Sequence, residues 1–381
     1  MIWFLISFLL VYGGMHAYLY EKARSALNLG QGAGIGLVGF MLIMVCSPIL
    51  IHWLKGWTFS QGVRVFAWVA YCWMGWLFIF CSAVFVFDGC RFFARFIRPF
   101  WKFDLARPAC SEKTLFLIIL FFTVTIAVYA LFEAQRIRIE RIKISSPKLL
   151  QDKDRLVIVQ VSDMHLGLIS GRRFLERVIS HIEKERPDIL VSTGDMVDAE
   201  PNRLTSLSSL LKEVHPRYGK FAVTGNHEFY AGIRDASFFI KEAGFTLLRD
   251  KAITIEDFIA IVGLDDCALA QTQNELPQTG RDILQQVPKR FFTILLKHRP
   301  EIEPGTECFF DIQLSGHTHG GQIFPFSLIT RFVYPLHKGL HKLVAGSFLY
   351  ASRGTGTWGP PMRVFAPPEV TVIEICKERI D

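Results

Sequence analysis

The pattern of hydrophobic and polar positions divides the chain into two parts. Up to about Gln135 the residues are mostly apolar, whereas the remainder alternates short apolar runs with polar loops. Four apolar stretches in the first part are each close to the ~20 residues that a helix needs to cross a bilayer. They cover about residues 1–20, 35–54, 65–87 and 114–132. We therefore expect a membrane domain of four transmembrane helices over residues 1–133.

The charges around these stretches bear on the orientation of the protein. The connection from Arg91 to Lys102 is basic, and the amino terminus before the first loop carries no Lys or Arg. By the positive-inside rule, this distribution weakly favours a second part that lies outside the cytoplasm. The cysteines show no disulfide-like spacing, which weakly favours the opposite face. The sequence predicts a multi-pass membrane protein and leaves the face of its second part open.

The net charge of +7 indicates the kind of partner. Much of this charge lies in short runs beside the apolar stretches, as in Arg91–Lys102, where basic and aromatic residues alternate. Such runs suit anionic lipid headgroups better than nucleic acid. We expect a membrane lipid or a lipid-linked molecule as the partner and no nucleic acid, and the oligomeric state stays open.

Strand and helix patterns alternate in the second part. Residues 134–150 are predicted to form a linker and an edge strand, in which Arg136–Ile144 alternates charged and apolar residues with one slip that indicates a bulge. From Phe245 the apolar runs become short, which indicates antiparallel strands. We expect an α/β layered domain over residues 151–381. Buried strands are predicted at Leu156–Val161, Asp188–Thr193 and Lys220–Thr224, with helical stretches between them.

Polar side chains that can bind metals follow the predicted strands. Asp163 and His165 stand two apart after the first strand, and alternate residues of an extended chain point the same way. Ligands in α/β folds gather at the carboxyl ends of strands, so we expect the side chains at successive strand ends to meet. The candidates are Asp163, His165, Asp195, Asn226, His298, His317 and His319.

Seven mixed nitrogen and oxygen ligands suit two borderline divalent ions, with Mn first and Fe, Zn or Co as alternatives. Two ions that share a carboxylate can clamp the attacking and leaving oxygens of a displacement at phosphorus. Gly194, Gly225 and Gly316 precede ligands, and we expect them to supply positive φ angles and close backbone approach. His227 follows Asn226 directly, so its side chain should diverge from the metals and face a substrate.

The blocks DMH, GDMVD, GNHE, KHRP and GHTHGGQ together resemble the calcineurin-like metallophosphoesterase superfamily, over roughly Leu156–Glu374. The resemblance implies an αββα sandwich, here preceded by the four transmembrane helices, with a dinuclear centre. It implies that Asp195 bridges the metals and that His227 is the catalytic histidine. The remaining ligands would divide into Asp163, His165 and His319 for one metal and Asn226, His298 and His317 for the other.

The closing stretch Ser352–Arg363, with the apolar leader, is similar to the bacterial membrane-bound YkuE/YaeI-like branch of that superfamily. This resemblance implies a phosphohydrolase of the bacterial cytoplasmic (inner) membrane that cleaves a phosphoester or pyrophosphate bond of a lipid-linked substrate such as UDP-2,3-diacylglucosamine. Arg353 and Arg363 are predicted to bind a second phosphate, unless they are satisfied surface residues. A general phosphodiesterase or phosphatase, and a non-catalytic membrane metal-binding scaffold, are the alternatives.

The segment Ile323–Leu340 is unusually apolar for a loop that follows metal ligands. Two interpretations are open. It predicts either an amphipathic flap that dips into lipid and receives an acyl chain, or a hairpin that packs in the core.

Overall fold

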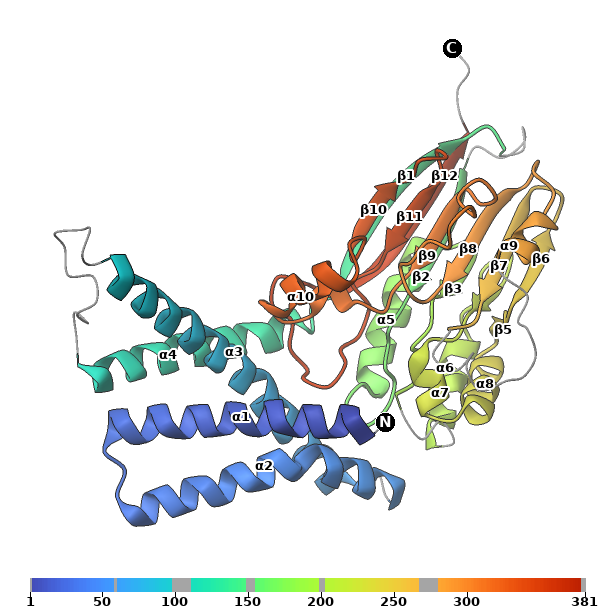
Figure 1. Cartoon of the computed structure of the whole chain (residues 1–381). Helices are drawn as coiled ribbons and strands as arrows, with labels where there is room; N and C mark the ends of the chain where they lie inside the picture. The colour runs from blue at the N-terminus through green and yellow to red at the C-terminus, as the bar shows by residue number, and fades with distance from the viewer. Residues whose placement is uncertain are drawn as a thin grey trace. The chain divides into compact units, whose positions relative to one another are not determined.

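The computed structural model describes residues 2–57, 60–97, 111–148, 155–198, 203–266 and 280–377. The chain divides into two compact units, which are coloured along the sequence in Figure 1. The first comprises Met1–Phe132 with Gly359–Met362, and the second comprises Glu133–Trp358 with Arg363–Asp381.

Long helices form the described part of the first unit. Three of them contain apolar segments long enough to cross a membrane, at Gln31–Leu54, Gln61–Ala94 and Glu112–Glu133. The predicted span at residues 1–20 falls within a fourth helix that is not among these three, so a count of four spans stays a prediction. Of the basic connection at residues 91–102, residues 98–102 lie outside the described residues. The helices are α1 (Ile2–Leu27), α2 (Gln31–Trp57), α3 (Gln61–Ile97) and α4 (Glu112–Glu133).

Two six-stranded sheets form the described part of the second unit. The first has the order β1-β12-β2-β3-β4-β5 and the second the order β10-β11-β9-β8-β7-β6. In the first sheet the strands are β1 (Arg138–Ser146), β2 (Arg155–Val161), β3 (Ile189–Ser192), β4 (Lys220–Ala222), β5 (Thr246–Leu247) and β12 (Glu369–Lys377). In the second they are β6 (Lys251–Ile255), β7 (Ile259–Leu264), β8 (Phe292–Lys297), β9 (Ile312–Ser315), β10 (Gly339–Lys342) and β11 (Phe348–Ala351).

Helices cover the outer faces of the two sheets. In α5 the buried residues Leu175, Val178 and Ile182 recur at helical spacing, so one side of that helix packs on the first sheet. Figure 1 shows α5, α6 and α8 along the first sheet and α9 beside the second, so the predicted αββα sandwich is confirmed. The helices are α5 (Arg172–Glu185), α6 (Thr205–Lys212), α7 (Asn226–Tyr230), α8 (Ile233–Glu242), α9 (Gly280–Gln285), η4 (His319–Gly321) and α10 (Phe326–Val333).

The hydrophobic core lies between the sheets. Ile158 and Ile373 from the first sheet pack in one cluster with Ile261 and Ile294 from the second, and all four are fully buried. Strands β2, β3 and β4 are parallel neighbours, as are β8 and β9. Their carboxyl ends therefore meet at one edge of the sandwich, where ligands gather in such folds.

Two local predictions about the sheets are wrong. Strand β1 pairs with β12 in an unbroken parallel register, so the predicted bulge is absent. The apparent slip arises because Glu140 and Arg141 both have ionic partners: Glu140 pairs with Arg353 at 2.8 Å and Arg141 with Glu185 at 2.7 Å. After Phe245, β6 and β7 are antiparallel as expected, but β5 pairs in parallel with β4.

Candidate metal centre

The seven predicted ligands all follow strands that end at the same edge of the sandwich. In the first sheet, β2 precedes Asp163 and His165, β3 precedes Asp195, and Asn226 begins α7 just after β4. The second sheet contributes the remaining three: His298 directly after β8, and His317 and His319 after β9.

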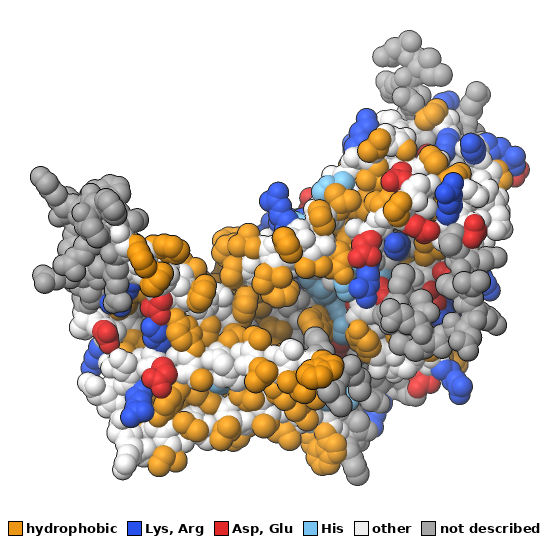
Figure 2. Space-filling view, viewed as in Figure 1, with side chains coloured by type: hydrophobic (Ala, Val, Ile, Leu, Met, Phe, Trp, Pro, Cys, Tyr) orange, Lys and Arg blue, Asp and Glu red, His pale blue; other side chains and the backbone are white. Residues whose placement is uncertain are grey.

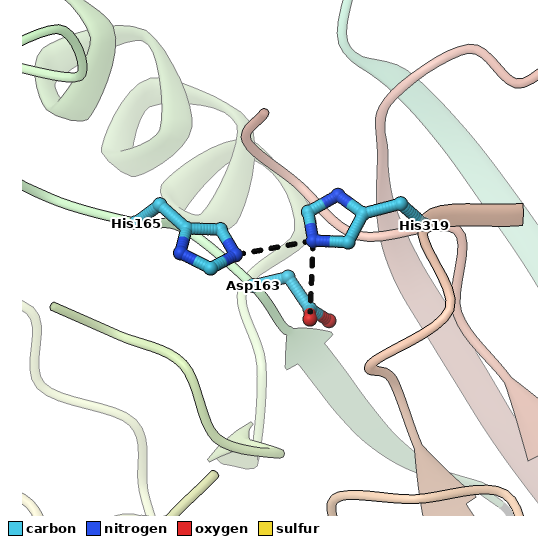
Figure 3. A group of neighbouring side chains, drawn as sticks. All are labelled: Asp163, His165 and His319. Atoms are coloured by element: carbon cyan, nitrogen blue, oxygen red, sulfur yellow. Dashed lines mark hydrogen bonds and ion pairs between the residues drawn. The ribbon is translucent and has the colours of Figure 1, made fainter. Parts of the chain in front are cut away.

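Asp163, His165 and His319 form one group, shown in Figure 3, whose ligand atoms lie within 4.8 Å of one another. His319 Nε2 is 3.1 Å from His165 Nε2 and 3.4 Å from Asp163 Oδ1. Ligand atoms about 2.1 Å from one ion stand roughly 3.0–3.4 Å apart. The backbone N–H of His317 donates to both Asp163 oxygens, at 3.0 and 3.1 Å, and fixes that carboxylate. The group therefore fits a single ion.

Asp195, His298 and His317 form a second group of the same size. His298 Nε2 is 3.2 Å from Asp195 Oδ2 and 3.1 Å from His317 Nδ1. Asp195 Oδ2 also lies 3.9 Å from His165 Nε2, in the first group. The position of Asp195 between the two groups is the one that a bridging carboxylate requires.

One buried polar atom tests whether this cluster fits cations. Among the described residues, Asn226 Oδ1 has no hydrogen-bond partner. A buried polar atom left without a partner costs about 1–3 kcal/mol. A cation beside the carboxamide oxygen of Asn226 would supply the partner that it lacks. The donor set and this unpaired oxygen therefore fit a divalent metal site, and the role of each residue as a ligand stays a prediction.

The backbone at the ligands is unusual. Its φ is +52° at Asp163, +46° at His165, +51° at Asp195, +70° at His317 and +50° at His319. Residues other than glycine seldom adopt this left-handed conformation, which costs about 1–3 kcal/mol for each residue and is concentrated at functional sites. The expectation that Asp163 and His165 converge because the chain is extended there is therefore wrong. They converge through left-handed turns after β2 has ended.

The three glycines at the site have different roles. Gly194 has the expected positive φ, of +95°. Gly225 instead has an ordinary φ of −106°, and Gly316 is not among the positive-φ glycines. A Cβ atom on Gly225 would collide with the carboxylate of Asp195, and one on Gly316 with that of Asp163. At these two positions glycine is needed for close packing against the ligands and not for its backbone freedom.

The buried carboxylate of Glu228 holds two of the ligand loops together. One of its oxygens accepts the backbone N–H groups of Asp195 and Gly225, at 2.9 and 2.7 Å. The other accepts those of Met196 and Val197, at 2.8 and 3.2 Å. Burial, together with the charge of Asp195, raises the pKa of Glu228 to about 7. It joins the loop after β3 to the loop after β4.

The charges within the cluster also favour cations. Burial would raise the pKa of the Asp195 carboxyl, but the His298 imidazole outweighs it and holds that pKa well below its usual range. Burial opposes charge on His298, yet Asp195 raises its pKa to about 10. Burial and the charges of His298 and Arg299 lower the pKa of His317 to about 3. The site thus favours the neutral form of His317 for ligation and stabilises positive charge beside Asp195, which a bound ion would supply.

His227 lies next to Asp195 and His165. Its Nδ1 is 3.0 Å from Asp198 Oδ1 and donates its proton there, because a carboxylate only accepts. Burial opposes charge on this imidazole, but the bond to Asp198 outweighs it and raises the pKa of His227. The ring stands edge-on to Trp358, with centroids 5.7 Å apart. The His227 ring is therefore oriented by Asp198 and has its Nε2 left for chemistry.

The two arginines predicted to bind phosphate already have protein partners. Arg353 pairs with Glu369 at 2.5 Å as well as with Glu140. Arg363 is fully buried, and its guanidinium donates to the carbonyl oxygens of Arg353 and His319 at 2.7 and 2.9 Å. It also lies 3.2 Å from His319 Nδ1. These contacts speak against a substrate-binding role for either arginine, which stays an untested prediction.

Two residues at the site have roles that the sequence did not indicate. Asp198 stands in the GDMVD block, and the sequence did not show that it contacts His227. The Tyr334 hydroxyl lies 3.1 Å from His317 Nε2 and 3.3 Å from Arg299 Nη1. No spacing pattern connects Tyr334 with the motifs, because a loop and α10 separate it from His317.

Comparison with known proteins places this site in a family. Residues 156–321 match the calcineurin-like phosphoesterase family. The chain is similar to an uncharacterized metallophosphoesterase of Aquifex aeolicus, at 37% identity over 257 residues, which cover 67% of this chain and 98% of that protein. It is 33% identical over 236 residues to the uncharacterized metallophosphoesterase YkuE of Bacillus subtilis, covering 58% of this chain and 79% of YkuE.

The name of a further relative describes it as a transmembrane protein. It is a transmembrane protein with metallophosphoesterase domain from Danio rerio, 32% identical over 283 residues, which cover 71% of this chain and 64% of that protein. The apolar helices of the present chain agree with such an association with membranes. The sandwich, the paired ligand groups and these matches show that the chain belongs to the calcineurin-like phosphoesterase family and is a metal-dependent phosphoester hydrolase.

Proposed function

We propose that the protein is anchored in a bacterial cytoplasmic membrane and hydrolyses a phosphoester or pyrophosphate bond of a lipid-linked substrate, of which UDP-2,3-diacylglucosamine is one candidate. The observation that carries the proposal is the presence, on one chain, of a phosphoesterase centre and of helices apolar enough to span a bilayer. A soluble substrate would not require this attachment. The lipid-linked class therefore explains both parts of the chain.

The ligand groups define what this chain would do with two divalent ions, Mn being the first candidate. Such ions polarise phosphoryl oxygens and offset the charge that gathers on the phosphorus in the transition state. Two sets of residues would hold them, joined by Asp195. The first set is Asp163, His165 and His319, and the second is Asn226, His298 and His317.

His227 is the residue that we assign to proton transfer. Asp198 fixes the ring by accepting the Nδ1 proton, so the other nitrogen keeps one orientation toward the substrate. An imidazolium in that position donates a proton to the leaving oxygen as the bond to phosphorus breaks. Its raised pKa keeps the ring protonated more of the time, as a general acid requires.

Turnover of a panel of lipid-linked diphosphates, with Mn added, tests the proposed substrate class. The full chain in detergent should release nucleotide or phosphate from at least one of them. No turnover of any by metal-loaded protein, together with hydrolysis of the soluble diester bis(4-nitrophenyl) phosphate, would refute the lipid-linked class. That result would favour a general phosphodiesterase.

His227→Ala tests catalysis against a scaffold role. We expect kcat to fall by about 10²–10⁴-fold, the usual contribution of general acid–base catalysis. The metal content, measured by mass spectrometry, should stay that of the unmodified protein. Unchanged turnover with this variant would contradict the role of His227, and failure of the unmodified protein on every substrate would favour a metal-binding scaffold.

A further inference from the structure

Helix α10 presents an apolar face to the outside of the molecule. Leu328, Ile329, Phe332 and Val333 are 61%, 56%, 89% and 59% exposed, whereas Thr330 is buried on the other side of the helix. Their spacing puts these four side chains on one side of the helix, which we call the α10 apolar face. Figure 2 shows hydrophobic side chains gathered over this helix. The prediction of a core-packing hairpin at residues 323–340 is therefore wrong.

The charges around the α10 apolar face suit one kind of partner. From Ile312 to Pro368 the sequence contains no Asp or Glu, while Arg331, Lys338 and Lys342 lie on α10 or shortly after it. An apolar helix face with basic and no acidic residues near it in the sequence is typical of helices that lie in the interface of an anionic membrane. A contiguous exposed apolar patch also marks an interaction site, in contrast to single exposed side chains.

The chain itself keeps the second unit close to a membrane. Helix α4, which is apolar enough to span a bilayer, ends at Glu133, and β1 begins at Arg138. Four residues lie between them, and the five steps from Glu133 to Arg138 reach at most about 18 Å, so the phosphoesterase unit stays near any bilayer that α4 crosses. The bilayer surface is therefore the partner that this unit, which carries α10, meets at the highest local concentration.

The helix is connected to the metal centre at both ends. It begins shortly after the 3₁₀ turn His319–Gly321, and it is followed by Tyr334, whose hydroxyl lies 3.1 Å from His317 Nε2. We propose that the α10 apolar face inserts into the surface of an anionic lipid bilayer and brings the metal centre to phosphoesters held in that bilayer. The second part rests on the proposed function, whereas insertion itself does not.

Photo-crosslinking tests insertion without reference to activity. p-Benzoylphenylalanine replaces Phe332 in the full chain, which is reconstituted in vesicles of phosphatidylethanolamine and phosphatidylglycerol. The matched control carries the same group at Phe238, an exposed phenylalanine on α8. We expect lipid adducts at position 332 at a yield at least about tenfold above the control, as expected for burial of a large apolar side chain. Crosslinks to this chain's own helices or to a second copy, without lipid adducts, would overturn the proposal.

Enzyme assays test the link to the substrate. The double variant Leu328→Ser with Phe332→Ser should hydrolyse CDP-diacylglycerol in the same vesicles about tenfold more slowly, since two apolar anchors are lost. Hydrolysis of soluble bis(4-nitrophenyl) phosphate should not change, and Phe238→Ser should alter neither rate. An equal fall of both rates in the double variant would overturn delivery from the membrane. If lipid adducts form but the unmodified protein hydrolyses no phosphoester, insertion stands and the proposed function fails.

Discussion

The substitution Glu228→Gln tests how firmly the ligand loops are held. The glutamate accepts four backbone N–H groups, two at each oxygen, at distances from 2.7 to 3.2 Å. Glutamine has the same shape, but its NH₂ group would face two of these donors and could accept from neither. Each buried donor left without an acceptor costs about 1–3 kcal/mol, so the variant should lose roughly 2–6 kcal/mol. In a domain of about this size, 1 kcal/mol shifts Tm by about 2–4 °C.

Thermal unfolding of the full chain in detergent, followed by tryptophan fluorescence, measures this loss. We expect Tm to fall by about 8–16 °C for a mid-range loss of about 4 kcal/mol. Binding of Mn, measured by titration calorimetry, should weaken as well, because Glu228 orients the loop that carries Asp195. The control is Glu242→Gln, on an exposed position of α8, which should shift stability by no more than about 0.5 kcal/mol. A Tm of Glu228→Gln equal to that of the control would refute the assigned role.

Three further predictions follow from the site and the core. Asp198→Asn should lower kcat by about 10–100-fold with full metal content, because the ring of His227 loses its anchor; equal rates would contradict this. Removal of metal by a chelator should lower Tm, and Mn added at 100 times its Kd should restore about 2.7 kcal/mol of stability. A Tm that does not change when Mn is added would contradict the metal site. Burial lowers the pKa of the Lys220 side chain from 10.5 to about 8. Between these two pH values the unfolded chain binds more protons than the folded protein, so the free energy of unfolding should rise with pH there. Lys220→Met should abolish that rise in Tm, and a rise that persists would contradict the assignment.

The alternation of strands and helices and the position of the candidate ligands at strand ends could be predicted because both depend on local patterns. Apolar runs with helices between them indicate parallel strands, whose ends meet at one edge of a sheet. The DMH, GNHE and GHTHGGQ blocks stand where such runs end. The bulge expected in β1 was wrong because the pattern alone does not show which charges have partners, and Glu140 pairs with Arg353, far away in the chain.

The part of the site that the sequence did not reveal depends on residues brought together from separate loops. Tyr334 reaches His317 only because α10 folds back beside the ligand loop. Arg363 looks like a surface cation in the sequence, yet it is enclosed by carbonyl groups of the chain. Burial of this kind is a property of packing, and no spacing rule encodes it.

The sequence by itself indicated the candidate ligands at the strand ends, an α/β layered domain and the apolar character of the first part, since composition and periodicity act over short distances. The αββα layers were implied by the resemblance of its motifs to a known family. Only the tertiary structure decided three other features. These are the left-handed backbone at five predicted ligands, the contact of Asp198 with His227 and the exposure of the α10 apolar face. The physical reason is that strain, hydrogen bonding and exposure are set by the surroundings of a residue, and the fold supplies those surroundings from distant parts of the chain.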